Sequence, residues 1–450
     1  MGTMAAKLQK TISDKLENRP GIRRVLGNVG WLFWDRLLRM GLGLFVSAMT
    51  MRMLGPSGYG LLNWASAWAS NFAIVAGLGL DNVVVRDLIR FPESRNSILG
   101  TTFRMKLVGG LTAFVLGVGS IVAFHPHVGT SQSYLQILVA LYTGIAIMQA
   151  FDTIDFFYQS QVASQYVVYV RSPTYLVMSG VRLWLIHVHA SPAAIAATML
   201  VETTLAAIGL YVSYRLNRHA IREWKFETRW MKALLRDSWP VVLTAFAIAS
   251  QTKVDQLMLG VMVDRATVGQ FSAAVGMVEA FGFLPMVIYT AVAPSIIQSR
   301  SVSEDLFYSR MRNLYRIMFL LFVGIAVPLI FLAKPIVLFM LGGKYLAASH
   351  LVVLLVIRVF FMNLGVARSL FLTTENLLGY KLVAALLGAG INITLNWVLI
   401  PRYQAVGSVW AMTISLFVTI FLIDIFYKPV RRNFMEMVRA VLTPWKISLS

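Results

Sequence analysis

The stretch "WLFWDRLLRMGLGLF", residues 31–45, is apolar enough to enter a lipid bilayer, yet it carries Asp35, Arg36 and Arg39. A charge at the centre of a membrane helix costs about 2.5–3.5 kcal/mol on insertion scales, and such charges persist where they face one another or a hydrated interior. Asp35 and Arg39 are four residues apart and can pair on one face of a helix. The stretch therefore predicts a membrane helix with one polar face turned away from lipid.

The composition of the whole chain is that of a membrane protein. Of its 450 residues, 58% are hydrophobic and only 13% are charged, whereas soluble domains are about 45–50% apolar and about 25% charged. The absence of cysteine excludes disulfides and thiolate chemistry. The sequence holds no P-loop of the form G-x-x-x-x-G-K-[ST], which excludes ATP hydrolysis of that type. We expect neither a cofactor nor a metal.

Long apolar runs predict an all-α, polytopic membrane protein with 12 transmembrane helices. A helix needs about 20 apolar residues to cross the hydrocarbon core. The predicted spans lie near residues 26–53, 61–85, 97–124, 133–158, 170–188, 192–213, 239–263, 266–294, 314–338, 346–373, 379–400 and 404–427.

The positions of Lys and Arg predict the orientation of the chain. Of the 40 Lys and Arg residues, 27 fall in the two terminal segments and alternate loops, and four fall in the loops between. Because cytoplasmic loops carry the Lys and Arg excess, both termini are expected in the cytoplasm, with the spans in the cell (inner) membrane. Most of the net charge of +20 is then a topology signal, which disfavours nucleic-acid binding. Arg171 is counted with these loops, although it lies eleven residues from Arg182 and so in nearly the same helical direction.

A basic loop divides the spans into two groups of six. The expected parts are a basic cytoplasmic leader (1–25), an N-terminal six-helix lobe (26–213), a basic cytoplasmic linker (214–238), a C-terminal six-helix lobe (239–427) and a cytoplasmic tail (428–450). An internal echo between "MLGPSGYGLL" at 53–62 and "MLGVMVDRATVGQF" at 258–271 indicates duplication. All external loops are short, which disfavours polymerases, ligases and glycosyltransferases, so we expect a protein that is not an enzyme.

Charges within the predicted spans indicate a shared polar cavity. Nine Lys and Arg side chains lie inside spans, and lipid-facing positions for all of them would cost on the order of 20–30 kcal/mol. Polar residues recur at helical spacing on several spans, as Gln149, Asp152, Asp155 and Gln159 do. We therefore expect the two six-helix lobes to surround a central cavity.

The candidate site residues are drawn from these charges. The candidate substrate-binding cations are Arg36, Arg39, Arg104, Lys106, Arg182, Lys253, Arg358 and Arg368. The candidate coupling or ion-pair residues are Asp35, Asp152, Asp155, Asp255 and Glu279. An excess of cations favours an anionic ligand, and Arg suits phosphate because its planar fork donates two hydrogen bonds at once. Alternatively, the cations pair across helices or snorkel to the membrane surface, and Asp152 and Asp155 are pairing partners instead of protonatable coupling sites.

Several motifs resemble the Wzx-type flippases of the polysaccharide biosynthesis protein family, in the multidrug/oligosaccharidyl-lipid/polysaccharide exporter superfamily. The motifs are "MLGPSGYG" at 53–60, "GLGLDNVVVRDL" at 77–88, "KVDQLMLG" at 253–260, "VGQFSAA" at 268–274, "LGGKYLAAS" at 341–349 and "INITLNWVLIPRYQAVGSVWAMTIS" at 391–415. The likeness extends over about residues 25–427. One departure is Gln404, which stands where a glycine is common after the "IP-x-Y" turn.

This resemblance implies a flippase that turns a polyprenyl-pyrophosphate-linked oligosaccharide from the inner to the outer leaflet. The product would serve cell-surface polysaccharide synthesis such as that of O-antigen. The implied mechanism is alternating access around a cationic cavity, with Arg36 and Arg39 as cavity cations and Lys253, Arg358 and Arg368 as candidates from the second lobe. The expected protein is a monomer in contact with membrane lipid, with a polysaccharide polymerase as partner. Ion-gradient coupling through one of the aspartates is a hypothesis.

Two alternatives lie within the same superfamily. A multidrug or small-molecule cation antiporter would use nearly the same helical bundle but needs exposed carboxylates for its cationic substrates. A lipid II flippase typically has two further spans, which the sequence does not show.

Overall fold

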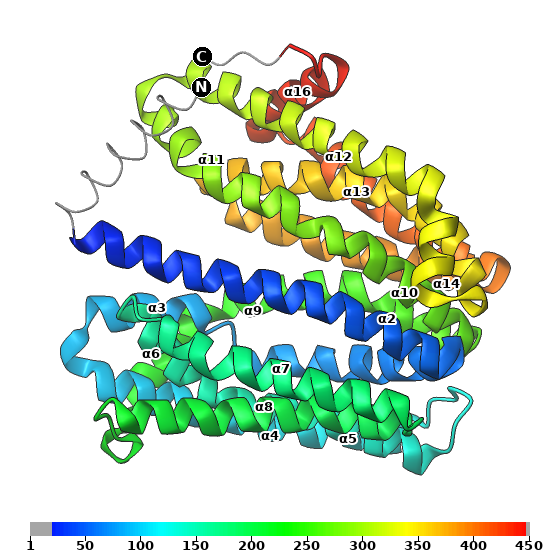
Figure 1. Cartoon of the computed structure of the whole chain (residues 1–450). Helices are drawn as coiled ribbons and strands as arrows, with labels where there is room; N and C mark the ends of the chain where they lie inside the picture. The colour runs from blue at the N-terminus through cyan, green and yellow to red at the C-terminus, as the bar shows by residue number, and fades with distance from the viewer. Residues whose placement is uncertain (1–19, 447–450) are drawn as a thin grey trace, which may run out of the picture. The chain divides into compact units, whose positions relative to one another are not determined.

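The computed structural model describes the backbone of residues 20–446, with the side chains of Trp31, residues 35–74 and residues 76–446. Every regular element in this range is a helix (Figure 1). The α-helices are α2 (Pro20–Gly77), α3 (Asp81–Arg90), α4 (Arg95–Phe124), α5 (Gln132–Met148), α6 (Asp152–Ser160), α7 (Gln165–His187), α8 (Pro192–Leu216), α9 (Thr228–Met262), α10 (Arg265–Glu279), α11 (Phe283–Val302), α12 (Glu304–Leu341), α13 (Leu346–Thr374), α14 (Leu378–Phe417), α15 (Ile423–Phe426) and α16 (Lys428–Leu442). Most of the predicted leader lies outside the described residues.

Eight helical segments of the described chain are long and apolar enough to cross a membrane. They are Asp35–Ile74, Pro92–Phe124, Gln132–Ser160, Pro192–Leu216, Arg265–Val302, Glu304–Leu341, Gly343–Thr374 and Leu378–Phe426. The predicted multi-pass, all-helical membrane protein is thus confirmed, whereas the total of twelve spans stays a prediction. Two predicted spans, those on α7 and α9, are not among the eight; these helices carry Arg171 and Arg182, and Lys253 and Asp255.

Two of the eight segments contain a break in the helical backbone. In α2 the break is at Gly55 (φ 65°, ψ 178°), and in α14 it is at Gln404 (φ 50°, ψ −129°). Each break lies at or near the boundary between two predicted spans. A positive φ suits glycine, which has no Cβ to clash, so Gly55 fits its place in "MLGPSGYG". Gln404 occupies the same kind of position without that freedom, which gives a physical reason for the glycine expected there.

The chain divides into two compact units. The first comprises Met1–Ser47, Val75–Leu116 and Leu141–Trp239, and the second comprises Ala48–Ile74, Gly117–Ala140 and Pro240–Ser450. The division at Trp239 and Pro240 coincides with the end of the predicted linker. Residues 48–74 and 117–140, which the sequence groups with the N-terminal lobe, cluster with the second unit.

The first unit has an aromatic core to which the predicted linker 214–238 contributes. Trp224 and Trp230 of this segment are buried in the same cluster as Phe157 and Tyr214. The backbone of Lys225 donates a hydrogen bond to the carbonyl of Asn96 at 3.1 Å. In the loop after α8, burial lowers the pKa of His219, whose ring centroid lies 4.9 Å from that of Phe157. The linker is therefore a packed part of this unit.

In the second unit, close backbone contact joins the later part of α2 to α10. A Cβ on Gly60 would lie 1.7 Å from the Arg265 carbonyl oxygen, and a Cβ on Gly269 would lie 2.0 Å from the Pro56 carbonyl oxygen. Glycine is the residue that permits helix backbones to approach this closely. These glycines belong to "MLGPSGYG" and "VGQFSAA", so part of each motif serves packing. Helices α11, α12 and α13 lie side by side around the core of this unit (Figure 1).

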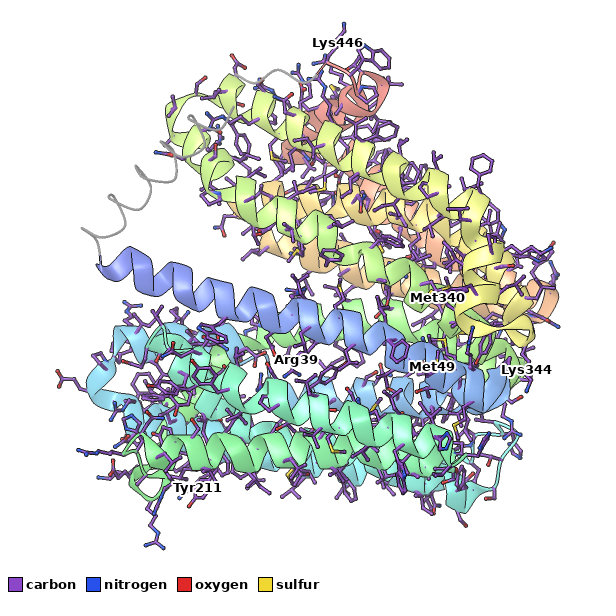
Figure 2. All side chains as sticks on the ribbon, viewed as in Figure 1. Arg39, Met49, Tyr211, Met340, Lys344 and Lys446 are labelled. Carbon is purple, nitrogen blue, oxygen red and sulfur yellow. The ribbon has the colours of Figure 1, made fainter. Side chains whose placement is uncertain are left out.

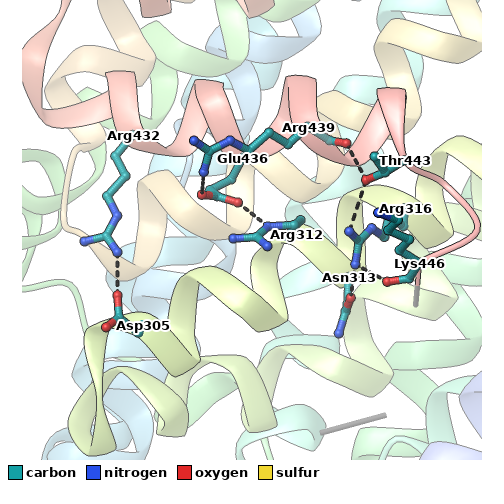
Figure 3. Close-up of polar contacts among 9 residues, drawn as sticks. All are labelled: Asp305, Arg312, Asn313, Arg316, Arg432, Glu436, Arg439, Thr443 and Lys446. Carbon is teal, nitrogen blue, oxygen red and sulfur yellow. Dashed lines mark hydrogen bonds and ion pairs between the residues drawn. The ribbon is translucent and has the colours of Figure 1, made fainter. Parts of the chain in front are cut away.

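Helix α16 packs against the first half of α12 through polar contacts, some of which Figure 3 draws. Asn433 and Tyr315 exchange hydrogen bonds of 2.8 and 3.1 Å. The buried carboxylate of Glu436 accepts hydrogen bonds from Arg312 and, at 3.0 Å, from Arg439. The predicted tail 428–450 therefore begins with a helix that forms part of the second unit.

Replacing Glu436 by Gln removes the buried charge that these two arginines share. Hydrogen bonds to charged groups contribute about 1.5–3 kcal/mol each. We expect E436Q to lower the free energy of unfolding by about 1–3 kcal/mol, measured as a lower midpoint of thermal unfolding in detergent. The matched control is Glu304→Gln, whose ion pair with Arg432 is about half exposed on both sides and contributes about 0–1 kcal/mol. Equal midpoints for the two variants would contradict the role given to Glu436.

Replacing Gln404 by Gly should stabilise the protein. The Gln404 side chain is exposed, so little packing is lost, while the strain of a positive φ on a residue with a Cβ is relieved. Strained backbone positions cost about 1–3 kcal/mol, so we expect a gain of about 1 kcal/mol and a higher midpoint of thermal unfolding. Gln404→Ala keeps the Cβ and should give no gain. A midpoint that rises as much for the alanine variant would show that φ is not the cause.

Candidate functional site

A polar cavity of about 250 Å³ lies inside the first unit, among α2, α5, α6, α7 and α8. Its polar lining consists of Arg39, Gln149, Asp152, Arg171, Thr174, Glu202 and Thr203. The remaining lining is apolar and comes largely from α5 and α8. Because these groups come from five helices, the cavity depends on the packing of the unit and not on one local motif.

Arg39 lies on the first part of α2 and is held there by its neighbours (Figure 2). Its Nε donates to both carboxylate oxygens of Asp35, at 2.9 and 3.0 Å. Ser172 donates to the same carboxylate, and the guanidinium lies 5.0 Å from the ring centroid of Tyr175. Arg39 Nη2 is buried and has no hydrogen-bond partner among the described residues. The pairing of Asp35 with Arg39 predicted from their spacing is thus confirmed, and it leaves one donor of Arg39 unused.

Arg171 of α7 connects the cavity to α6. Its Nη2 lies 2.6 Å from Asp152 Oδ1, and its Nη1 lies 2.9 Å from Asp155 Oδ2. Buried Lys106 adds a longer contact, 4.0 Å from Asp152 Oδ2, and lies 3.8 Å from Asp81 Oδ1. In the structure both Asp152 and Asp155 therefore contact a cation.

A third buried pair crosses from α7 to α8. Arg182 contacts Glu202 with its Nη2, and its Nε donates to Thr198 Oγ1 at 2.8 Å. Glu202 lines the cavity, whereas Arg182 does not. This ion pair holds the carboxylate of Glu202 in position at the edge of the cavity.

The charge balance of this cluster differs from the prediction. The described cations Arg39, Lys106, Arg171 and Arg182 contact the carboxylates Asp35, Asp81, Asp152, Asp155 and Glu202. The expected excess of cations over carboxylates is therefore wrong for this cavity. The physical reason is the cost of burying an unpaired charge, which each cation avoids by a contact with a carboxylate.

Two further predicted cations form ion pairs inside the second unit. Arg358 donates from Nη2 to Glu279 Oε1 at 2.8 Å, while its Nη1 is buried without a partner among the described residues. Arg368 binds Asp424 with two hydrogen bonds of 2.7 and 2.6 Å. Tyr380 donates to Asp424 as well, at 2.7 Å.

Asp255 of α9 lies in a different environment in the second unit. It is fully buried, and its Oδ1 accepts hydrogen bonds from Asn396 at 2.6 Å and from Asn392 at 3.3 Å. Ser408 donates to Asn396 at 2.7 Å, and Asp255 Oδ2 has no partner among the described residues. Of the predicted aspartates, Asp255 is the one for which the described part of the chain supplies no ion pair. Arg358 influences it only through longer-range electrostatics.

Three further predicted cations lie outside the cavity lining and outside the ion pairs described above. Arg36 is exposed on α2, and Arg104 is exposed with its guanidinium 5.5 Å from the ring centroid of Phe226. Lys253 is half-buried in the second unit.

Sequence reasoning did not identify several other residues that line the polar cavity. Arg171 was assigned to a loop, although its eleven-residue spacing from Arg182 indicated a helix. Glu202 is recognisable in the sequence only as an acidic residue near the end of a span. Thr174 and Thr203 carry no distinct signal, because single polar residues on apolar helices have many roles.

Comparison with known proteins identifies both family and fold. The family model described as "Polysaccharide biosynthesis protein" matches residues 25–300. The structure of "Lipid II flippase MurJ, inward closed conformation" is similar with a TM-score of 0.68 and 15% identity, covering 93% of this chain and 92% of that chain. An inward-facing multidrug resistance MATE family transporter of the MOP superfamily gives a TM-score of 0.61 and 12% identity, with 91% and 93% coverage. Curated protein sequences give no match.

At such low identities these structures establish the fold alone. The two proteins with this fold are described as a flippase and a transporter. The family model, by contrast, covers more than half of the chain. The protein therefore belongs to the polysaccharide biosynthesis protein family.

Proposed function

We propose that this protein is a flippase that moves a polyprenyl-pyrophosphate-linked oligosaccharide from the inner to the outer leaflet for cell-surface polysaccharide synthesis. The observation that carries the proposal is the buried Nη2 of Arg39, which has no partner among the described residues, at the polar cavity in a chain of the polysaccharide biosynthesis protein family. The similarity of the fold to a lipid II flippase supports a lipid-linked substrate.

Arg39 is suited to bind a phosphate oxygen without losing its own partner. Asp35 is bound through Nε alone, so a substrate that accepts from Nη2 leaves that ion pair intact. An Arg that bound its carboxylate through both terminal nitrogens would have to break the pair first. The arrangement keeps the guanidinium oriented in a partly buried site, where a charge-assisted hydrogen bond is stronger than in water.

The neutral groups of the cavity suit the sugar part of the same headgroup. Gln149, Thr174 and Thr203 offer amide and hydroxyl groups that pair with sugar hydroxyls. A volume of about 250 Å³ is at the small end for ligand sites. The cavity therefore suits the pyrophosphate and adjoining sugar, and the rest of the oligosaccharide would lie outside it.

The proposed layout has twelve transmembrane helices in two lobes with both termini cytoplasmic. The eight apolar segments include two with a backbone break, at Gly55 and at Gln404. Counting each broken segment as two spans and adding α7 and α9 gives this layout. The lobes would alternate access to the two leaflets of the cell membrane, with the protein acting as a monomer beside a polysaccharide polymerase.

The first prediction from the proposed function concerns Arg39. In liposomes with a labelled polyprenyl-pyrophosphate-sugar, we expect Arg39→Ala to weaken binding and slow leaflet exchange by about tenfold or more, because a charge-assisted hydrogen bond of about 1.5–3 kcal/mol is lost. Arg39→Lys should retain part of the binding, since it keeps the charge and loses the planar fork. Binding isotherms and leaflet-exchange rates provide the measurements.

Two controls separate this effect from a loss of folding. Asp35→Asn leaves the Arg39 charge in place and should bind the pyrophosphate at least as well as wild type. Arg104→Ala changes an exposed cation outside the cavity and should leave both rates unchanged. Wild-type exchange equal to that of protein-free liposomes would reject the flippase proposal.

The second prediction concerns ion coupling. Asp35, Asp152 and Asp155 each contact an Arg, whereas Asp255 has no ion pair within the described residues. We therefore propose Asp255 as the coupling acid for protons or sodium ions. We expect Asp255→Asn to abolish the response of substrate exchange to an imposed proton or sodium gradient while exchange without a gradient continues. Asn is nearly isosteric and still accepts from Asn396, which limits the structural cost. Glu279→Gln is the paired-carboxylate control, and an unchanged gradient response in the Asp255 variant would exclude that residue.

A cation antiporter of the same superfamily is the second candidate function. It is favoured by one observation, the balance of carboxylates and cations around the cavity. The same liposomes decide between the two functions. Uptake of an organic cation that Arg39→Ala leaves intact, without exchange of the pyrophosphate lipid, would favour the antiporter.

A further inference from the structure

The first unit has a second hollow, formed by two helices that also line the polar cavity. It is a groove of about 570 Å³ between α7 and α8. Tyr166, Tyr169 and Val170 line it from α7, and Gly209, Val212 and Leu216 line it from α8. Apart from Ser213 and Asn217 at one end, the groove is bordered by apolar and aromatic side chains.

The depth of the groove depends on Gly209. A Cβ at this position would lie 2.5 Å from Val170 Cγ1, so a larger residue would fill the space above the contact between the helices. The rim is exposed: Tyr169 is 54% exposed, Val212 45% and Leu216 79%. The groove is therefore open along its length to whatever surrounds this face.

The two aromatic walls are held in place by other rings. Tyr166 packs on Tyr158 with ring centroids 5.2 Å apart, and Tyr169 packs edge-on against Trp31 at 5.1 Å. Aromatic side chains provide large, rigid apolar contact area. The groove is thus a preformed apolar surface.

The groove and the cavity share one helical wall. On α7, Arg171 and Thr174 face the cavity, while the neighbouring Val170 lines the groove. On α8, Leu210 borders the cavity and the adjacent Gly209 borders the groove. The polar hollow and the apolar hollow therefore adjoin one another along this helix pair, and the groove lies nearer the start of α7 and the end of α8.

The face that carries the groove has the composition of a lipid-facing surface. Around the groove, exposed apolar side chains continue along both helices: Val177, Val181 and Trp184 on α7, and Val201, Leu205 and Ile208 on α8. In a multi-pass membrane protein such a face lies against hydrocarbon. An occupant of the groove is consequently a hydrocarbon chain.

We propose that this groove holds the isoprenoid chain of the same lipid whose pyrophosphate binds at Arg39, an inference that rests on the proposed function. A headgroup in the cavity requires its chain to leave toward hydrocarbon, and the groove is an apolar hollow that adjoins the cavity along α7 and α8 and has an exposed rim. Val212 and Tyr169 then contribute to recognition of the chain, and α7 and α8 line the sites of both parts of one ligand.

The test compares lipids that share a headgroup and differ in chain length. Wild-type protein in liposomes is titrated with a long-chain polyprenyl-pyrophosphate-sugar and with its farnesyl counterpart. Val212→Trp fills the rim of the groove, and Ile208→Trp places the same bulk one turn away, outside it. We expect wild type to prefer the long chain, Val212→Trp to reduce that preference by about tenfold, the equivalent of about two buried methylenes, and Ile208→Trp to leave it unchanged.

A photocrosslinking measurement checks the place of contact without filling the groove. A photoreactive phenylalanine analogue replaces Tyr169 in the groove or exposed Val177 outside it. Labelling by the long-chain lipid should be stronger at 169, and unlabelled polyprenyl pyrophosphate should compete while a diacyl phospholipid does not. Equal labelling at both positions, equal competition by phospholipid, or equal effects of the two Trp variants would overturn the groove assignment.

The outcomes distinguish a failure of the groove from a failure of the flippase. If the groove alone is wrong, Arg39→Ala still weakens binding of both chain lengths, and Val212→Trp changes neither. If wild type binds neither pyrophosphate lipid better than a phosphate-free isoprenol, the flippase proposal fails and the groove proposal fails with it.

Discussion

Buried guanidinium groups must find a partner, and this requirement shapes both units of the protein. In a medium without water, the free-energy cost of burying a cation that has no carboxylate partner is far larger than the stabilisation from any single packing contact. Arg39, Arg171 and Arg182 each contact an acid in the first unit, and Arg358 and Arg368 each contact an acid in the second. Apart from the local pair of Arg39 with Asp35, these contacts join different helices, so the ion pairs also fix which helices lie next to one another.

Backbone approach is the second constraint, and it explains residues that carry no charge. Gly60 and Gly269 allow α2 and α10 to touch at distances that any side chain would prevent. Gly209 instead makes room for the side chain of Val170 between α7 and α8. At Gln404 the backbone has a positive φ, which suits glycine, but the residue there carries a Cβ. Packing and turn geometry thus account for several motif positions that would otherwise be assigned to substrate binding.

Sequence reasoning succeeded where a signal is local or summed over many residues. The membrane class followed from composition, and the Asp35 and Arg39 pair followed from a spacing of four residues on one helix. It failed where the partner lies far along the chain. Asn392 and Asn396 were visible as a polar stripe, but their contact with Asp255 spans 137 and 141 residues. The predicted excess of cations in the cavity was wrong for the same reason. A count of charges within spans cannot show which carboxylate each cation contacts.

The contrast between Asp255 and the paired aspartates has a mechanistic consequence. A carboxylate that contacts Arg has its charge compensated inside the protein, so protons and sodium ions outside have little influence on it. Asp255 has asparagines around it, and the part of the chain that the structure describes gives it no paired cation and leaves one of its oxygens without a partner. Its buried charge can be compensated by a proton or a small cation that enters from solution. A transporter needs at least one group of this kind if an ion gradient is to bias its cycle, and a substrate site needs groups of the other kind, charged and oriented in advance. Arg39 has the properties required of a substrate-site group, and Asp255 has those required of a coupling group.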